Sequence, residues 1–230
     1  MIPSEGAHHF IDIDRYGVYP FDSLPRSWNK AVEKYGQDTL QAYGIVPWHI
    51  QTMLARLTTA FKERNLPKIL KYSADIGHYI ADAHVPLHVC SNHNGKFTNQ
   101  QGIHGFWESR VPELLAATKR DFFIGKAGYI DNPLACTWAR VLESAAAWDS
   151  VLRMERELSQ QFSPDRKFAF EERNGQVIRQ YSTAYCVAYD KLLNNRTTYA
   201  AIYICRCQFL VYRLGKCRPA QFTTIGKHSF

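Results

Sequence analysis

Five side chains that could bind a metal ion lie within a stretch of 31 residues. They are His78, Asp82, His88, His104 and Glu108. Within each of the pairs 78/82 and 104/108 the two residues are four apart, and side chains at this spacing share one face of a helix. Two helices could therefore each direct a histidine and a carboxylate at a common point, with His88 following the first helix. Imidazole and carboxylate are the usual ligands of catalytic zinc, so the spacing predicts a metal site.

The same spacing allows an alternative, a network of histidines and carboxylates between two helices without a metal ion. The faces that carry the two pairs are otherwise occupied by apolar or aromatic residues. Burying an unpaired carboxylate is costly, so each acid needs a partner, and a metal ion supplies one to all of them. For the remaining candidates the expectations are modest. We interpret His49 as structural, His84 as exposed or as support for the site, His93 as exposed, and Asp75 as either a partner of His78 or a surface carboxylate.

The spacing of apolar residues predicts an all-α chain. We expect a polar loop at residues 90–101, and helices at 26–35, from Pro47 to about 62, from Pro67 to about 83, from 103 to about 115, from 133 to about 158, and at 166–193. Pro86 prevents the third helix from continuing, and Pro112 predicts a kink or break in the fourth. Residues 1–24 have no helical period and are expected to form a loop or extended segment.

Charge and length restrict the class of protein. The chain has 230 residues, a net charge of +7 and no run of eighteen apolar residues, so no transmembrane segment is expected. Its first ten residues have neither the basic nor the apolar region of a signal peptide, which predicts a cytoplasmic location for the chain as written. Six of the basic residues lie between 196 and 230, where there is no acid. We therefore predict one helical domain at 1–195 and an atypical basic tail at 196–230.

The text HYIADAHVPLH followed by GIHGFWE resembles the superfamily of zinc-dependent phospholipases C and single-strand-specific nucleases of the S-one/P-one type. The resemblance extends over about residues 8–193. It implies a multi-helix bundle, monomeric in our interpretation, around a cluster of up to three zinc ions that hydrolyses phosphodiesters. The substrates that it implies are single-stranded DNA or RNA, or a phospholipid.

The resemblance also assigns site residues. His78 and Asp82 match ligands of a first zinc, with Asp82 bridging to another metal and acting in catalysis. His88, His104 and Glu108 match the complete ligand set of a second zinc. In the segment HHFIDID, His9 matches a further ligand of the first zinc, and Asp12 matches a catalytic acid near the substrate phosphate. His8 is adjacent to His9 but out of register.

Two features depart from the family pattern. Intact members begin with a tryptophan whose amino group and carbonyl bind the third zinc, and they carry further ligands before the segment that matches His9; they are secreted or periplasmic. This chain starts at Met1, so we expect its start to lie downstream of the family's N-terminus and only one zinc site to be complete. We also interpret residues from about 196 onward as frameshifted, since a one-base shift can convert FLVYRLGKCRPAQF into a segment typical of bacterial members. The alternative is a genuine divergent tail.

Three functions follow from these patterns. The first is a zinc phosphoester hydrolase, either a nuclease or a phospholipase. Glu108 favours the phospholipase branch and the Phe-Trp before it favours the nucleases, and we favour an endonuclease. For base stacking, Tyr16, Tyr19 and Phe21 are candidates, although aromatic residues in such positions more often belong to the core. The second function is a catalytically impaired fragment that binds one zinc or none, and the third is a basic nucleic-acid-binding module that depends on the tail.

Overall fold

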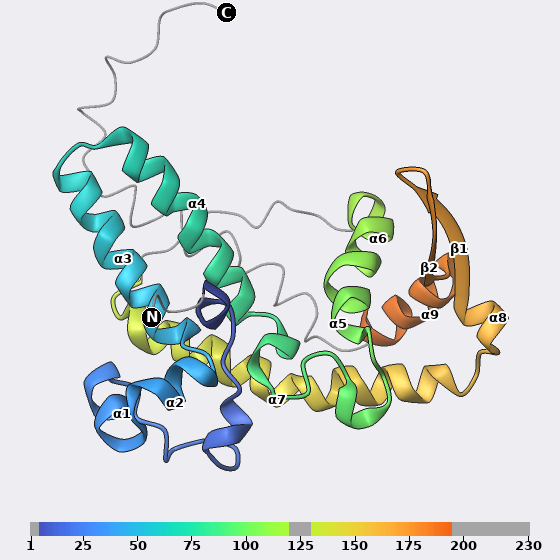
Figure 1. Ribbon diagram of the computed structural model, residues 1–230, viewed down its shortest axis with the longest axis horizontal. Coiled ribbons are helices and arrows are strands. Elements are labelled where there is room, and N and C mark those ends of the chain that lie inside the picture. The colour runs from blue at the N-terminus through green and yellow to red at the C-terminus, as the bar shows by residue number, and fades with distance from the viewer. Residues whose placement is uncertain (1–4, 120–129, 195–230) are drawn as a thin grey trace, which may run out of the picture.

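The computed structural model describes residues 5–119 and 130–194, and this part of the chain is mainly helical (Figure 1). The α-helices are α1 (Trp28–Tyr35), α2 (Gln37–Ala42), α3 (Val46–Lys62), α4 (Leu66–Ala83), α5 (Ile103–Gly105), α6 (Val111–Lys119), α7 (Pro133–Ser159), α8 (Pro164–Lys167) and α9 (Thr183–Asn194). Two strands, β1 (Phe168–Arg173) and β2 (Gln176–Tyr181), form an antiparallel hairpin. The expected tail at 196–230 and the domain boundary before it lie outside the described residues.

The predicted helix starts are confirmed where a cap and a proline coincide. Asn65 accepts a hydrogen bond from the backbone N–H of Lys68 at 3.1 Å and begins α4, with Pro67 in the first turn. In the same way Asn132 accepts from the N–H of Ala135 at 3.0 Å and begins α7. In each helix the Asn side chain accepts a hydrogen bond from a backbone N–H of the first turn. The proline of that turn has no N–H that needs a partner. Together they define where the helix begins.

Two clusters of buried apolar side chains share α7. The first joins the N-terminal segment to α1–α4 and the beginning of α7, and the second joins α5, α6 and α9 to the rest of α7. Trp148 packs against both clusters. Val89 belongs to the first cluster and Leu87 to the second, so His88 stands where the two cores meet.

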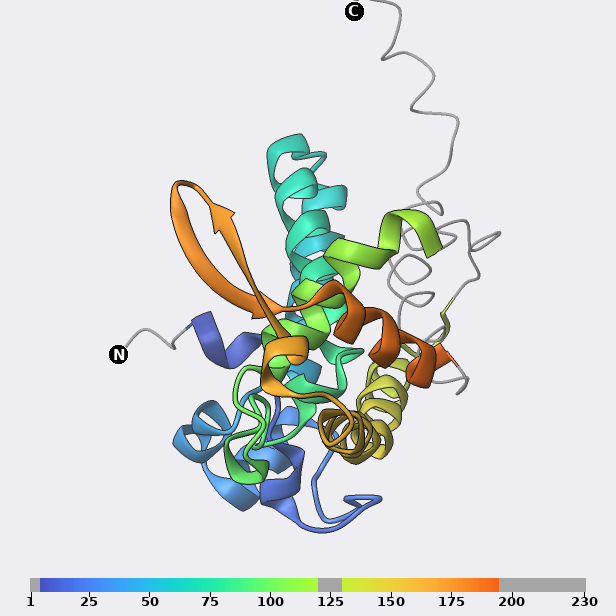
Figure 2. The same ribbon diagram turned by 90° about the vertical axis from the view of Figure 1, so that its right-hand side faces the viewer.

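The single helix expected at 166–193 is wrong, because a β-hairpin interrupts it. Asn174 and Gly175 both have positive φ, at 52° and 75°, and together form the tight turn between β1 and β2. Asn-Gly is the preferred pair for a two-residue turn that needs positive φ at both positions. Arg173 at the end of β1 forms an ion pair of 2.7 Å with Glu113 of α6, so the hairpin (Figure 2) is attached to the helices near its turn.

The break expected near Pro112 takes the form of a π-helical segment. Residues Phe106–Arg110 form this segment between α5 and α6. Pro112 has no N–H to donate to the carbonyl of residue 108, so the α-helical ladder cannot continue unchanged through this turn. Short π-helical segments recur at functional sites, and this one carries Glu108. Among the described residues, no helix combines the length and apolarity needed to cross a bilayer.

Candidate metal centre

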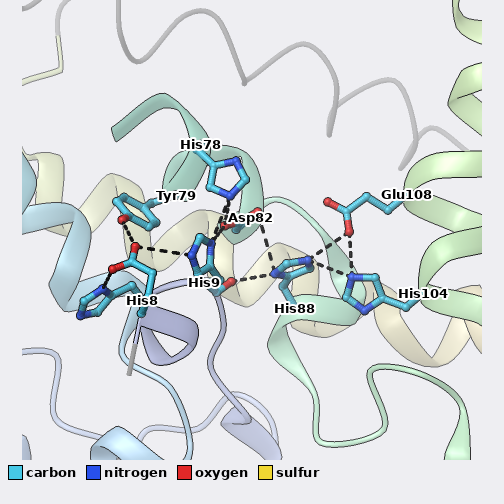
Figure 3. A network of polar contacts seen from close by, with 9 residues as sticks. His8, His9, His78, Tyr79, Asp82, His88, His104 and Glu108 are labelled. Atoms are coloured by element: carbon cyan, nitrogen blue, oxygen red, sulfur yellow. Dashed lines mark hydrogen bonds and ion pairs between the residues drawn. The ribbon is translucent and has the colours of Figure 1, made fainter. Parts of the chain in front are cut away.

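Three side chains from two distant segments converge at the first group of candidate ligands. His9 follows a short 3₁₀ turn (Glu5–His8), while His78 and Asp82 lie one turn apart on α4. The Nδ1 atom of His9 is 2.9 Å from Oδ2 of Asp82 and 3.1 Å from Nε2 of His78 (Figure 3). The third side of this triangle, from His78 Nε2 to Asp82 Oδ2, measures 3.5 Å. We call these residues the first triad.

The second triad is formed by His88, His104 and Glu108, the set that the family resemblance implied; the spacing alone predicted one common point for all five ligands. The Nε2 atoms of the two histidines are 3.1 Å apart, and Oε2 of Glu108 is 2.7 Å from His104 and 3.2 Å from His88. His88 comes from a 3₁₀ turn that Pro86 begins after α4, His104 from α5, and Glu108 from the π-helical segment. Figure 3 shows the three side chains pointing toward one another.

The donor atoms of both triads fit a zinc ion. Zinc binds nitrogen and oxygen at about 2.0–2.1 Å in tetrahedral geometry, which places neighbouring ligand atoms roughly 3.3 Å apart. Distances of 2.9–3.5 Å in the first triad lie around this value, and those of 2.7–3.2 Å in the second lie slightly below it. Two imidazole nitrogens at 3.1 Å from each other share one proton at most, whereas a common cation would satisfy both. Each triad supplies two histidines and one carboxylate, a ligand set of catalytic zinc.

The two triads are linked through His88. Its Nδ1 atom donates a hydrogen bond to the backbone carbonyl of His9 at 2.7 Å. In the reverse direction, the backbone N–H of Ile11 donates to the carbonyl of His88 at 2.9 Å. The second oxygen of Asp82, Oδ1, lies 3.9 Å from Nδ1 of His88. Asp82, which is 2 % exposed, therefore faces both groups, although its short contacts are made with the first triad.

In the second triad, the carboxylate of Glu108 and the two histidine rings affect one another's pKa. Burial acts to raise the pKa of Glu108, but hydrogen bonds from His104 and His88 outweigh it and hold the pKa well below its ordinary value. Burial likewise acts to lower the pKa of His88, and the carboxylates of Glu108 and Asp82 raise it above its ordinary value instead. Glu108 is thus held as a carboxylate, and its charge faces the rings of His88 and His104.

Around the first triad lies an outer group of side chains that the sequence did not identify. Tyr79 donates a hydrogen bond to Oε1 of Glu5 at 2.6 Å, and the same oxygen is 3.7 Å from Nε2 of His9. A carboxylate behind a metal-binding histidine orients its ring and increases its basicity. His8 is outside the triad, as predicted, and stacks on His49 with ring centroids 3.7 Å apart.

The other histidines and Asp75 are also placed. His49 is buried, in agreement with a structural role, and His93 is exposed as expected. His84 is 5 % exposed, which excludes the first of its two expected roles, an exposed residue, and leaves the second, support for the site, as a prediction. Its Nδ1 is 2.7 Å from the carbonyl of Ile80, one turn earlier on α4. Asp75 forms an ion pair with Lys71 at 2.6 Å rather than orienting His78.

Two acids anchor the loop that connects His88 to His104. At the start of the loop, Asp14 accepts hydrogen bonds from the N–H (2.9 Å) and the hydroxyl of Ser91. At its end, Gln100 donates to the carboxylate of Glu155 and to the carbonyl of Leu152. Glu155 is 1 % exposed and also accepts from Tyr185 (2.7 Å) and Lys167 (2.8 Å). An acid on the apolar face of α7 was a signal in the sequence that could have identified Glu155.

Asp12, the predicted catalytic acid, lies outside both triads. Its backbone N–H donates to the carbonyl of Tyr43 at 2.7 Å, next to the strand-like contact between Ile11 and His88. Burial, reinforced by the charge of Asp14 and opposed by Arg15, raises the pKa of Asp12 to about 6. Its carboxyl group can therefore gain or lose a proton close to neutral pH.

Comparison of the chain with protein-family models, with curated proteins and with solved structures finds no match.

Proposed function

We propose that the protein is a zinc-dependent hydrolase of phosphodiester bonds that acts as an endonuclease on single-stranded nucleic acid. The observation that carries this proposal is the convergence of two separate triads, each with two imidazole nitrogens and one carboxylate oxygen at ligand-to-ligand distances. Their near contact through His88 and Asp82 matches the needs of a reaction in which charge develops on several oxygens of one phosphate.

The two triads would each bind one zinc ion in such a reaction. His88, His104 and Glu108 would hold one zinc ion, and His9, His78 and Asp82 would hold another. Zinc bound to such donors acts as a Lewis acid on a phosphate oxygen and activates water near neutral pH. The hydrogen bond from His88 to the carbonyl of His9 fixes the ring so that Nε2 faces its triad.

Asp12 suits the role of an acid in this scheme. A general acid is most effective when its pKa is close to the working pH, and the pKa of Asp12 is raised to about 6. In its protonated form it can supply a proton to a leaving oxygen, and in its ionised form it can accept one. This role is the one expected from the resemblance of HHFIDID to the family segment.

The choice of nucleic acid over lipid rests on the chemistry of the exposed aromatic residues. Tyr16 and Phe21 are each 5 % exposed and belong to the core, so they are unavailable for stacking on bases. Tyr19 is 58 % exposed and remains the candidate. Phe97, in the loop between the ligands of the second triad, is 64 % exposed and offers a second flat ring.

Two further functions remain as alternatives. A phospholipase C would use the same two triads, and Glu108 as the acid of the second triad favours it by family resemblance. A fragment that binds a single zinc ion and does not turn over substrate is favoured by the first triad, which has one ligand (His78) with its side chain 61 % exposed. The second triad is more enclosed, since the exposures of its side chains are 12–27 %.

A combined measurement of metal content and hydrolysis tests the proposal. The purified protein is analysed by mass spectrometry for zinc and assayed with single-stranded DNA, bis-p-nitrophenyl phosphate and phosphatidylcholine vesicles, before and after chelation and zinc return. We expect two zinc ions and zinc-dependent cleavage of the DNA. Hydrolysis of the lipid alone would establish the phospholipase. One bound zinc ion without turnover would establish the impaired fragment. A protein that retains no zinc would refute all three functions.

A further inference from the structure

A cavity of about 430 Å³ lies between the beginnings of α1, α3 and α7, and none of the residues that line it belongs to either triad. Trp28, Trp48, Arg26 and His49 contribute to its wall. Its volume lies in the range of small-molecule sites, which are concave, mostly apolar and furnished with a few polar groups. None of the functions proposed above uses it.

Two tryptophan rings in the wall of this cavity meet at a steep angle. The rings of Trp28 and Trp48 are 5.6 Å apart with planes inclined by 65°, and the ring of Trp48 is 5.2 Å from that of Trp138 behind it. Trp48 is held in place by a hydrogen bond of 2.9 Å from its Nε1 to the carbonyl of Arg26. The flat apolar surface is therefore rigid, as a stacking site for a planar ligand requires.

Two polar atoms in the wall are buried without a hydrogen-bond partner in the described structure. One is Nη1 of Arg26 and the other is Nε2 of His49. The guanidinium of Arg26 is fixed from both sides, because its Cζ lies 4.5 Å above the ring of Trp138 and its Nη2 donates to the carbonyl of Pro20 at 3.4 Å. His49 is 7 % exposed, and its ring is clamped between His8 and Tyr79. A polar group that is buried without a hydrogen-bond partner is unfavourable, most of all when it is charged, so an acceptor for Arg26 and a partner for His49 are expected there.

The charge of the wall indicates what this acceptor is. Arg26 is the one charged residue among those that line the cavity, and no acid is among them. Burial lowers the pKa of Arg26 from its ordinary value, with Asp22 as the opposing charge. Burial, together with the charges of His8 and Arg56, lowers the pKa of His49 to about 4, so this ring is neutral near pH 7. The wall thus presents one poorly compensated cation beside aromatic faces.

We propose that this cavity binds a planar aromatic ring that carries an anionic oxygen, with the ring against Trp28 and Trp48 and the oxygen at the guanidinium group of Arg26. The neutral ring of His49 supplies a second hydrogen bond to the same ligand. A mononucleotide and a free aromatic carboxylate both have this chemistry. A guanidinium held flat by a tryptophan and offering N–H groups is well suited to either a phosphate or a carboxylate.

Tryptophan fluorescence of the metal-free full chain tests the proposal independently of the triads. After chelation, the protein is titrated with AMP, adenosine, ribose 5-phosphate and benzoate, and each affinity is checked by calorimetry. Saturable quenching by AMP, with at least tenfold weaker binding of adenosine and of ribose 5-phosphate, identifies a nucleotide site. Saturable binding of benzoate but not of AMP identifies a site for aromatic carboxylates. Absence of saturable binding by both overturns the proposal.

Substitutions in the wall of the cavity test whether the probe binds there. We expect Arg26→Met to weaken binding at least tenfold and Arg26→Lys to weaken it less, because lysine retains the charge without the planar fork. Arg15→Met is the matched control, since Arg15 lies 5.8 Å over the ring of Tyr43 at an exposed site outside the cavity. If Arg26→Met unfolds the chain by circular dichroism, Trp28→Leu serves in its place, because Trp28 is only partly buried. Unchanged affinity in a folded Arg26 or Trp28 variant overturns the proposal.

Discussion

The Nδ1 atom of His88 donates its proton to the carbonyl oxygen of His9 across 2.7 Å. A carbonyl oxygen can only accept, so this contact settles the tautomer of His88 when the ring is neutral and leaves the lone pair of Nε2 directed at the second triad. The same residue, His9, sends its side chain to the first triad. The backbone and side chain of one residue therefore serve two different groups of ligands.

Replacing His9 with alanine separates these two roles. The substitution removes one nitrogen ligand of the first triad but keeps the backbone carbonyl that orients His88. We expect zinc to be lost from the first triad and retained by the second, as measured by mass spectrometry of the dialysed protein. His8→Ala is the control, because His8 is adjacent in sequence and outside the triad. Equal loss of zinc in both variants would contradict the assignment.

The second triad is tested by Glu108→Gln, which retains the size of the side chain and removes its charge. Zinc affinity at this triad should fall by more than the roughly 10- to 100-fold that loss of an outer hydrogen-bond partner costs, since a direct ligand is weakened. Competition with a chelator of known affinity measures the change. Glu113→Gln is the matched control, because Glu113 is on the same stretch of chain and pairs with Arg173 instead. A weakened control together with an unaffected Glu108→Gln variant would refute the assignment.

The ligands of the second triad could be predicted from the sequence because they are neighbours along the chain, but the family resemblance was needed to separate them from His78 and Asp82. His104 and Glu108 meet at 2.7 Å as their spacing of four predicted, although the turn between them is partly π-helical. His9 is 69 residues from His78, so spacing alone could not place it, and the family resemblance was needed. The structural supports Asp14 and Glu155 were missed because they act across 77 and 55 residues.

The fold was predictable to a similar extent. Helices α4 and α7 begin where Asn and Pro coincide, since local hydrogen bonds decide such positions. The apolar pattern does not predict the hairpin, although Asn174-Gly175 is a turn signal, because it assigns the apolar residues on both sides to one helix. In a strand only every second side chain faces the core, and the burial along β1 and β2 follows this alternation in part.

The raised pKa of Asp12 predicts a pH-dependent penalty on folding. In the folded chain this pKa is about 6 and its ordinary value is 3.8, so the folded state binds the proton more tightly. The free energy of unfolding therefore falls as the pH rises from about 4 to about 6. Asp12→Asn should increase the free energy of unfolding of the metal-free protein by at most about 3 kcal/mol at pH 7 and change it much less at pH 4. Urea unfolding at both pH values measures the difference, with exposed Asp149→Asn as the control.

The same variant should lose hydrolytic activity at pH 7, because an amide neither gives nor takes a proton in this range. A gain in stability accompanied by a loss of activity is typical of a group that is kept in an unfavourable environment for function. If Asp12→Asn is instead less stable at pH 7, the carboxyl group has a partner that stabilises its charge.

The buried carboxylate of Glu155 supports the second triad from a distance. It holds Gln100, whose backbone carbonyl accepts the N–H of Ile103 at 3.1 Å, directly before His104. Its other partners are Lys167 before β1 and Tyr185 on α9. This one side chain therefore connects the loop before His104 to α7, α8 and α9.

Glu155→Gln should destabilise the protein by about 3–5 kcal/mol, because Lys167 loses its anionic partner in a site that is largely closed to water. It should also weaken zinc binding at the second triad, since the loop that positions His104 loses its anchor, while the first triad keeps its zinc. Urea unfolding and chelator competition measure the two effects separately. Glu157→Gln is the matched control, because Glu157 lies two residues further along α7 and forms an exposed ion pair with Arg153. Replacing zinc with cobalt gives a measurement that does not depend on stability alone. In the folded Glu155→Gln variant, the visible absorption of cobalt at the second triad should change. A purely structural role of Glu155 predicts an unchanged spectrum and a reduced stability.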